Sequence, residues 1–157
     1  MYDYINGIVA EKTPASVTIE AGGVGYAIAV SLGTYQQVPA CNEEMKIFTH
    51  HYVREDTQRL FGFASKTERT IFEKLIGINK VGPKVALSIL SGISVDQLVQ
   101  DVRTGTTTRL KSISGVGPKT AERLIMELKD KLDIEAAAHS PNTAPAATTD
   151  TTENDAR

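Results

Sequence analysis

Two short glycine-containing turns, 35 residues apart, carry the residues whose types and spacing are best suited to chemistry. Each turn reads Val-Gly-Pro-Lys, at 81–84 and again at 116–119, and apolar residues repeat on both sides of it. Two repeats are too few for a solenoid, so we interpret the turn as a local device that the chain uses twice. The equivalent pairs are Leu75 and Leu110, Ile78 and Ile113, Val81 and Val116, Gly82 and Gly117, Pro83 and Pro118, Lys84 and Lys119, Ala86 and Ala121, and Leu90 and Ile125.

The chemistry that this turn supports is the binding of an anion. Glycine permits a positive φ and the close approach of another backbone, and proline suits the first turn of a helix because its missing N–H is harmless there. The free amides of that helix start attract an anion, and Lys84 or Lys119 adds a full charge. Tight helix packing would explain a single copy equally well. The duplication, with lysine in both copies, favours two phosphate sites that hold the backbone of DNA without reading its bases.

Other chemical motifs do not fit the sequence. Residues 77–84 resemble a P-loop, but Pro83 and Lys84 stand where its Lys-Ser/Thr pair belongs, and no strand leads into the segment. His50 and His51 are adjacent in a predicted strand and should point to opposite faces, which makes a shared metal improbable. We find no nucleophilic triad either, so we expect no catalytic residue, no metal and no cofactor.

Basic residues are concentrated in the middle of the chain. The formal net charge of −2 averages −3 for residues 1–63, +5 for residues 64–132 and −4 for residues 133–157. A basic segment between acidic ends favours a nucleic-acid surface confined to one module, although a solvated helical face could have the same charge.

The N-terminus, the lack of a long apolar stretch and the single cysteine indicate a cytoplasmic protein. Asp3 stands where a secretory signal would carry positive charge, and no stretch approaches the roughly 18 apolar residues of a membrane span. Cys41 has no partner for an internal disulfide, which fits a reducing compartment. We therefore expect no membrane contact.

The elements that must position the two turns form two groups. Residues 1–63 predict a small closed barrel, with an OB-type barrel as the first expectation, because closure removes the exposed strand edges. After residue 63 the apolar pattern changes to helical spacing, which predicts an all-α domain over residues 64–132. Residues 136–157 have no Val, Ile, Leu, Met or aromatic residue, so we expect 133–157 to be a disordered tail. The strands are expected at Tyr4–Val9, Ser16–Glu20, Val24–Val30, Met45–Tyr52 and Gln58–Phe63, with a helical turn over Leu32–Gln37.

Longer stretches of the sequence resemble a known family. The tandem turns resemble paired helix-hairpin-helix motifs, and their position after a small barrel is similar to that in the RuvA family of Holliday-junction-binding proteins. The stretches that carry the resemblance are GGVGY at 22–26, VREDTQRLFGF at 53–63, ERTIFEKLI at 68–76 and GPKTAERLI at 117–125.

The resemblance implies a non-catalytic protein that binds four-way DNA junctions as a homotetramer or octamer. It would hold the junction open and square for the RuvB motor and the RuvC resolvase in recombination and repair. In this family carboxylates at Glu55 and Asp56 form an acidic pin at the crossover, and Arg54 and Arg59 beside them would guide the strands. The residues expected to hold DNA phosphates are Lys80, Val81, Gly82 and Lys84 in the first turn and Gly115, Val116, Gly117, Lys119, Thr120 and Arg123 in the second.

Two departures from the family pattern affect these expectations. Lys80 stands where the motif has its leading glycine, which Gly115 supplies in the second copy. Because a positive φ is unfavourable for lysine, we expect Asn79 to take up the left-handed conformation instead. The family also has a third domain, which binds the motor. We expect this domain to be missing here, either because the chain is truncated or because this version lacks it, so the resemblance does not imply that this chain recruits the motor.

Two other functions remain open at this point. A generic helix-hairpin-helix adaptor would bind duplex DNA as well as it binds junctions. A DNA glycosylase would use a catalytic aspartate after the hairpin, and Asp130 is the one comparable acid. Its setting, Lys129-Asp130-Lys131, favours a solvated charge pair.

Overall fold

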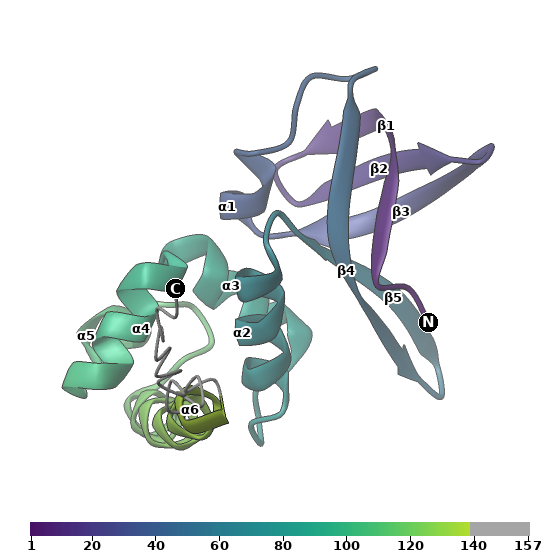
Figure 1. Ribbon diagram of the computed structural model, residues 1–157. Coiled ribbons are helices and arrows are strands. Elements are labelled where there is room, and N and C mark those ends of the chain that lie inside the picture. The colour runs from purple at the N-terminus through teal and green to yellow at the C-terminus, as the bar shows by residue number, and fades with distance from the viewer. Residues whose placement is uncertain (139–157) are drawn as a thin grey trace, which may run out of the picture.

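The computed structural model describes the backbone of residues 1–138 and the side chains of residues 1–132. Figure 1 shows a β-barrel beside a group of helices. The expected tail, residues 133–157, lies largely outside the described residues. Its first six residues are helical, because the last helix continues to Ala138.

The five strands form a closed barrel, as the sequence predicted, and the structure gives their order as β1-β2-β3-β5-β4. Neighbouring strands are antiparallel except β3 and β5, which are parallel. The short helix α1 (Leu32–Tyr35) connects β3 to β4, and Ser31 caps it by accepting a hydrogen bond from the Thr34 amide. The strands are β1 (Tyr4–Thr13), β2 (Ser16–Ala21), β3 (Val24–Val30), β4 (Glu44–Arg54) and β5 (Thr57–Phe63).

The interior of the barrel is filled by buried aliphatic side chains from every strand except β5 and from the segment after α1. At Gly62 of β5 the strands approach so closely that an added Cβ would lie 2.5 Å from Ile28 Cγ2 and Ile47 Cδ1. The buried side chains are Ile5, Val9, Val17, Ile19, Ile28, Val30, Val38 and Ile47.

In the described part of the chain five helices follow the barrel, and buried apolar side chains from all five form one cluster. Ser65 and Ser94 cap α2 and α4 through their hydroxyls, and α4 ends at Gly105, whose φ of 71° is left-handed. Among the described residues no single helix is long and apolar enough to cross a membrane; only α3 and α4 taken together, bent by 96°, pass that test of length and composition. The helices are α2 (Lys66–Ile76), α3 (Pro83–Gly92), α4 (Val95–Thr104), α5 (Thr108–Lys111) and α6 (Pro118–Ala138).

The barrel and the helices share their packing at α2. Phe61 and Phe63 of β5 are fully buried against Phe72 of α2, with ring centroids 5.1 and 4.9 Å apart. The buried Glu68 carboxylate of α2 accepts hydrogen bonds from the hydroxyls of Ser31 (2.5 Å), the N-cap of α1, and Thr34 (2.7 Å), within α1. These contacts hold the helices against the barrel.

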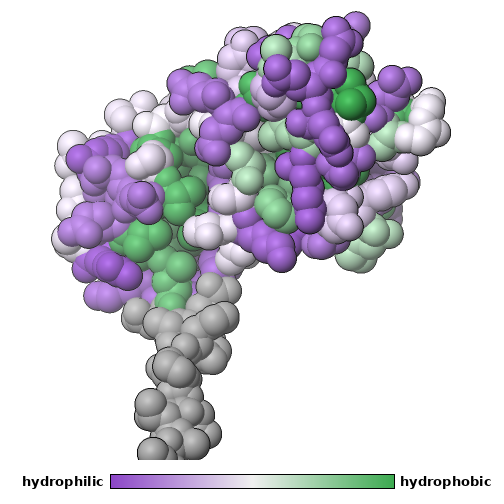
Figure 2. All heavy atoms as spheres, turned by 45° about the horizontal axis from the view of Figure 1, so that its top comes forward, coloured by the Kyte–Doolittle hydropathy of each residue, from purple (hydrophilic) through white to green (hydrophobic). Residues whose placement is uncertain are grey.

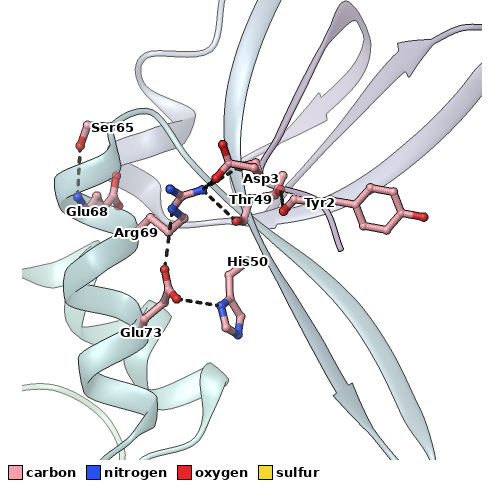
Figure 3. Close-up of polar contacts among 8 residues, drawn as sticks. All are labelled: Tyr2, Asp3, Thr49, His50, Ser65, Glu68, Arg69 and Glu73. Atoms are coloured by element: carbon pink, nitrogen blue, oxygen red, sulfur yellow. Dashed lines mark hydrogen bonds and ion pairs between the residues drawn. The ribbon is translucent and has the colours of Figure 1, made fainter.

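A second set of polar contacts joins α2 to the start of the barrel. Arg69 pairs with Asp3 at 2.7 Å and with Glu73 at 3.7 Å, and Glu73 lies 3.6 Å from His50 Nδ1 (Figure 3). Arg69 also donates to the Thr49 carbonyl. Helix α2 is therefore fixed to β1 and β4 as well as to β5, and this gives the helices a defined position relative to the barrel.

Candidate nucleic-acid interface

The two repeated turns have the same backbone hydrogen bonds. In the first copy, Ile78, Val81 and Ala86 donate to the carbonyls of Leu75, Ile78 and Gly82 at 3.0–3.1 Å. In the second copy, residues 113, 116 and 121 donate to the carbonyls of residues 110, 113 and 117 at 2.9–3.1 Å. The sequence repeat is therefore a repeat of backbone geometry. We call residues 77–82 the first hairpin and residues 112–117 the second hairpin.

The backbone at the leading position of each hairpin is left-handed. Gly115 has a φ of 89° and Lys80 has a φ of 69°. The expectation that Asn79 would take this conformation was wrong. The hairpin geometry is set by the helices on both sides, so the lysine adopts the φ that the position requires despite its cost.

Each hairpin leads into a helix that begins with proline, and there is open space beside the glycine that precedes this proline. Gly82 is the N-cap of α3 and no side chain caps it. A Cβ added at Gly82 or Gly117 would meet nothing within 4 Å, so space for a close ligand exists at both positions. Lys84 and Lys119 are exposed immediately after the prolines, while Thr120 is half-buried in the first turn of α6.

The two valines of the hairpins have an internal role. Val81 and Val116 are only 4% and 6% exposed, and their amides already donate to carbonyls within the turn. We therefore expect them to shape the turn rather than to contact a phosphate. This differs from the sequence expectation, which included both among the phosphate-binding residues.

The barrel places one candidate arginine beside the first hairpin and the other beside α3, the helix that follows it. Arg54 of β4 pairs with Thr57, and Arg59 of β5 pairs with Tyr52, and directly opposed residues in an antiparallel pair share one face. Arg54 and Tyr52 line a cavity together with residues 76–83. Arg59 lines another cavity with Lys84, residues of α3 and the turn between β1 and β2. The sequence singled out both arginines but not Tyr52, which its spacing of two from Arg54 in a strand could have indicated.

The predicted acidic pin lies at the tip of the β4–β5 hairpin. Glu55 and Asp56 form the two-residue turn between the paired residues Arg54 and Thr57, and both are exposed. Among the described side chains, those of residues 1–132, neither carboxylate forms an ion pair within 4 Å with a basic side chain. The tip therefore presents two uncompensated negative charges.

Most of the candidate cations are also uncompensated. In the described side chains Arg54, Arg59, Lys80, Lys84 and Lys119 form no ion pair with a carboxylate within 4 Å. The exception is an exposed arginine of α6 whose Nε lies 3.4 Å from a glutamate one turn later; these residues are Arg123 and Glu127. A group of free cations next to open helix starts is suited to phosphates, which would supply the missing negative charge.

The adjacent histidines lie on opposite faces of β4, as the sequence predicted. His50 packs on Phe72 with ring centroids 5.6 Å apart, whereas His51 packs on Tyr2 at 5.3 Å. Asp130, the acid considered for a glycosylase, is exposed on α6.

Comparisons with known proteins identify the family to which this arrangement belongs. A family model described as the RuvA N terminal domain matches residues 1–62, and one described as a SAM-like helix-hairpin-helix tandem matches residues 72–130. The Holliday junction branch migration complex subunit RuvA of Tolumonas auensis is 41% identical over 169 residues, which cover 99% of this chain and 81% of that protein. The chain belongs to the RuvA family.

Other RuvA proteins give the same result over most of the chain. The RuvA subunit of Salinibacter ruber is 47% identical over 132 residues, covering 84% of this chain and 65% of its own length. That of Pectobacterium atrosepticum is 45% identical over 152 residues, covering 93% of this chain and 74% of its own. The chain thus spans between about two thirds and four fifths of these relatives, and the RuvA match includes both the barrel and the two hairpins.

Proposed function

We propose that this chain binds four-way DNA junctions as a homotetramer and holds them open and square for branch migration, without catalysing a reaction itself. One observation carries the proposal: two hairpins with the same backbone hydrogen bonds, each followed by a lysine without an ion pair, lie in the same chain as an exposed carboxylate tip. The relatives' name, Holliday junction branch migration complex subunit, supports it.

The hairpins would hold the DNA backbone. Lys84 and Lys119 are exposed one residue after the prolines that start α3 and α6, so each places a charge beside the open amides of its helix. Thr120 and Arg123 would add contacts on α6, although Arg123 must share its charge with Glu127. Contacts of this kind fix the position of a duplex and carry no base information.

The acidic pin would shape the crossover by repulsion. Four copies of Glu55 and Asp56 at the centre of a tetramer would place eight carboxylates where the phosphates of four arms converge. Like charges in this arrangement disfavour a stacked junction and leave the open, square form as the better fit.

The motor and the resolvase are partners that we infer from the family alone. ATP hydrolysis would belong to RuvB, and cleavage of the junction to RuvC. Whether four or eight copies surround one junction depends on surfaces of this chain that meet only in the assembly.

The pin can be tested separately from the hairpins. Glu55→Gln combined with Asp56→Asn should retain or strengthen junction binding but lose the preference for the open form. Fluorescence transfer between dyes on adjacent arms measures that geometry, and Glu20→Gln, which removes an exposed acid on β2, is the matched control. An unchanged transfer efficiency in the double variant would remove the pin from the proposal.

A further inference from the structure

We propose that the barrel and the first hairpin form one shared phosphate clamp, in which Arg54 acts with Lys80 and Arg59 acts with Lys84. This clamp, rather than the pair of hairpins, would distinguish the crossover of a junction from a continuous duplex. The inference rests on the proposed function, since it assigns the residues that make the same DNA surface selective.

The geometry of the β4–β5 ribbon supports the clamp. Arg54 and Lys80 line one cavity, and Arg59 and Lys84 line another, so the barrel contributes one cation to each. Lys80 and Lys84 stand on the two sides of the Gly82-Pro83 step that starts α3. One cavity thus lies at the turn that leads into α3 and the other lies along α3, and each has one cation from the barrel and one from the helical part of the chain.

Arg54 is held in place before any ligand arrives. Its guanidinium carbon lies 4.3 Å from the ring centroid of Tyr52, and its Nη1 donates to the Val53 carbonyl at 2.9 Å. Arg59 lies 5.1 Å from the ring centroid of Phe61 in the same way. Stacking on an aromatic face leaves the remaining donors of a guanidinium free and reduces the entropy lost on binding.

The second hairpin has neither a leading lysine nor the barrel beside it. Its leading residue is Gly115, which carries no charge, where the first hairpin has Lys80. The helix that follows it, α6, packs on α2, α4 and α5, whereas β4 and β5 pack on α2. Figure 1 shows α6 away from the barrel, on the far side of α2. The barrel arginines therefore complete the first hairpin, and the two hairpins are not equivalent DNA sites.

The position of the pin makes the clamp selective. Arg54 directly precedes Glu55 in the sequence, so a phosphate held by Arg54 would lie beside the tip of the β4–β5 ribbon that carries the pin carboxylates. A straight duplex that filled the clamp would carry its next phosphates toward those carboxylates and be repelled. A strand that turns away at a crossover can fill the clamp without this penalty. Figure 2 shows hydrophilic residues at many places on the face of the barrel that is in view.

The test compares junction and duplex binding by fluorescence anisotropy at one fixed salt concentration. Arg54→Gln and Arg59→Gln should each weaken junction binding by about eightfold near 0.1 M salt, because each neutralised phosphate contributes about 0.9 to the salt slope. Duplex binding should change less than about twofold. The control at the second hairpin, Lys119→Gln, should weaken both substrates equally, and Lys12→Gln on β1 should change neither.

A chemical cycle then locates the contact. In a series of junctions, each has one phosphate near the crossover replaced by a neutral methylphosphonate. At one of these positions the replacement should weaken binding of the wild-type protein but not of Arg54→Gln. The clamp would be overturned if both arginine variants lost as much affinity for duplex as for junction, or if no methylphosphonate position behaved in this way. In either case a wild-type protein that still prefers the junction would leave the proposed function standing. A wild-type protein with no junction preference would instead overturn the proposed function and the clamp with it.

Discussion

Replacing Lys80 by glycine should make the protein more stable and, at the same time, a weaker DNA binder. Lys80 has a φ of 69°, a conformation that costs an ordinary residue about 1–2 kcal/mol relative to a right-handed one. Glycine avoids that cost but loses about 0.5–1 kcal/mol in backbone entropy. The net gain should be about 0.5–1 kcal/mol, which for a chain of this size raises the Tm by about 1–4 °C.

The matched control for this change is Lys80→Ala, which removes the same charge but keeps a side chain at a positive φ. Urea unfolding should therefore place Lys80→Gly about 0.5–1 kcal/mol above Lys80→Ala. Both variants should lose about one unit of salt slope on junction DNA, since both lose one phosphate contact. A glycine variant no more stable than the alanine variant would refute the reasoning that this backbone is strained.

The other predictions concern one DNA contact and two buried positions. Lys119→Ala should weaken binding to junction and duplex alike and lower the salt slope by about one unit, measured by titration at several salt concentrations; an unchanged slope would remove Lys119 from the phosphate contacts. Glu68→Ala leaves the hydroxyls of Ser31 and Thr34 without their acceptor and should cost about 3 kcal/mol in urea unfolding, with Glu68→Gln costing less; equal stability to wild type would contradict the buried network. Gly62→Ala puts a methyl 2.5 Å from two isoleucines and should cost about 1–3 kcal/mol of the free energy of unfolding, while Gly82→Ala, which meets nothing, should cost less than Gly62→Ala; the reverse order would contradict the close approach at Gly62.

The fold could be predicted wherever a local sequence pattern is typical of a single kind of secondary structure. All five strands and the helical turn after the third were expected because turn residues separate short β-branched runs. The first strand, expected to end at Val9, continues to Thr13 because its first five residues pair with β4 while its residues from Ile8 onward pair with β2, through a bulge between Val9 and Glu11. Such a double pairing depends on distant residues, and a local pattern does not contain it.

The parts of the candidate site that the sequence repeats could be predicted. The parts that depend on contacts between elements distant in the sequence could not. The duplication identified both hairpins, since two copies of one motif constrain each other. It could not place Arg54 beside the first hairpin or Arg59 beside α3, because that placement depends on how α2 packs on the barrel. The left-handed Lys80 was missed for a similar reason, since the surrounding helices override the preference of a single residue.

The role of Glu68 was also beyond the sequence. An acid in the first turn of a helix is expected on electrostatic grounds alone, since it faces the positive end of the helix dipole. Only the packed structure shows that its carboxylate is buried and accepts hydrogen bonds from Ser31 and Thr34, more than 30 residues earlier. Residues that join the two parts of the chain leave no signal of their own in a local pattern.

The most direct test of junction recognition is competition between a four-way junction and a linear duplex of equal length for the wild-type protein. Both DNAs must be present at one fixed, moderate salt concentration, because phosphate contacts make every affinity depend on salt. We predict that duplex in large excess leaves the labelled junction bound, because only the strands of a crossover can contact the hairpins and the clamp without meeting the acidic pin. Displacement of the junction by an equal amount of duplex would contradict this account and leave a protein that binds the DNA backbone in general.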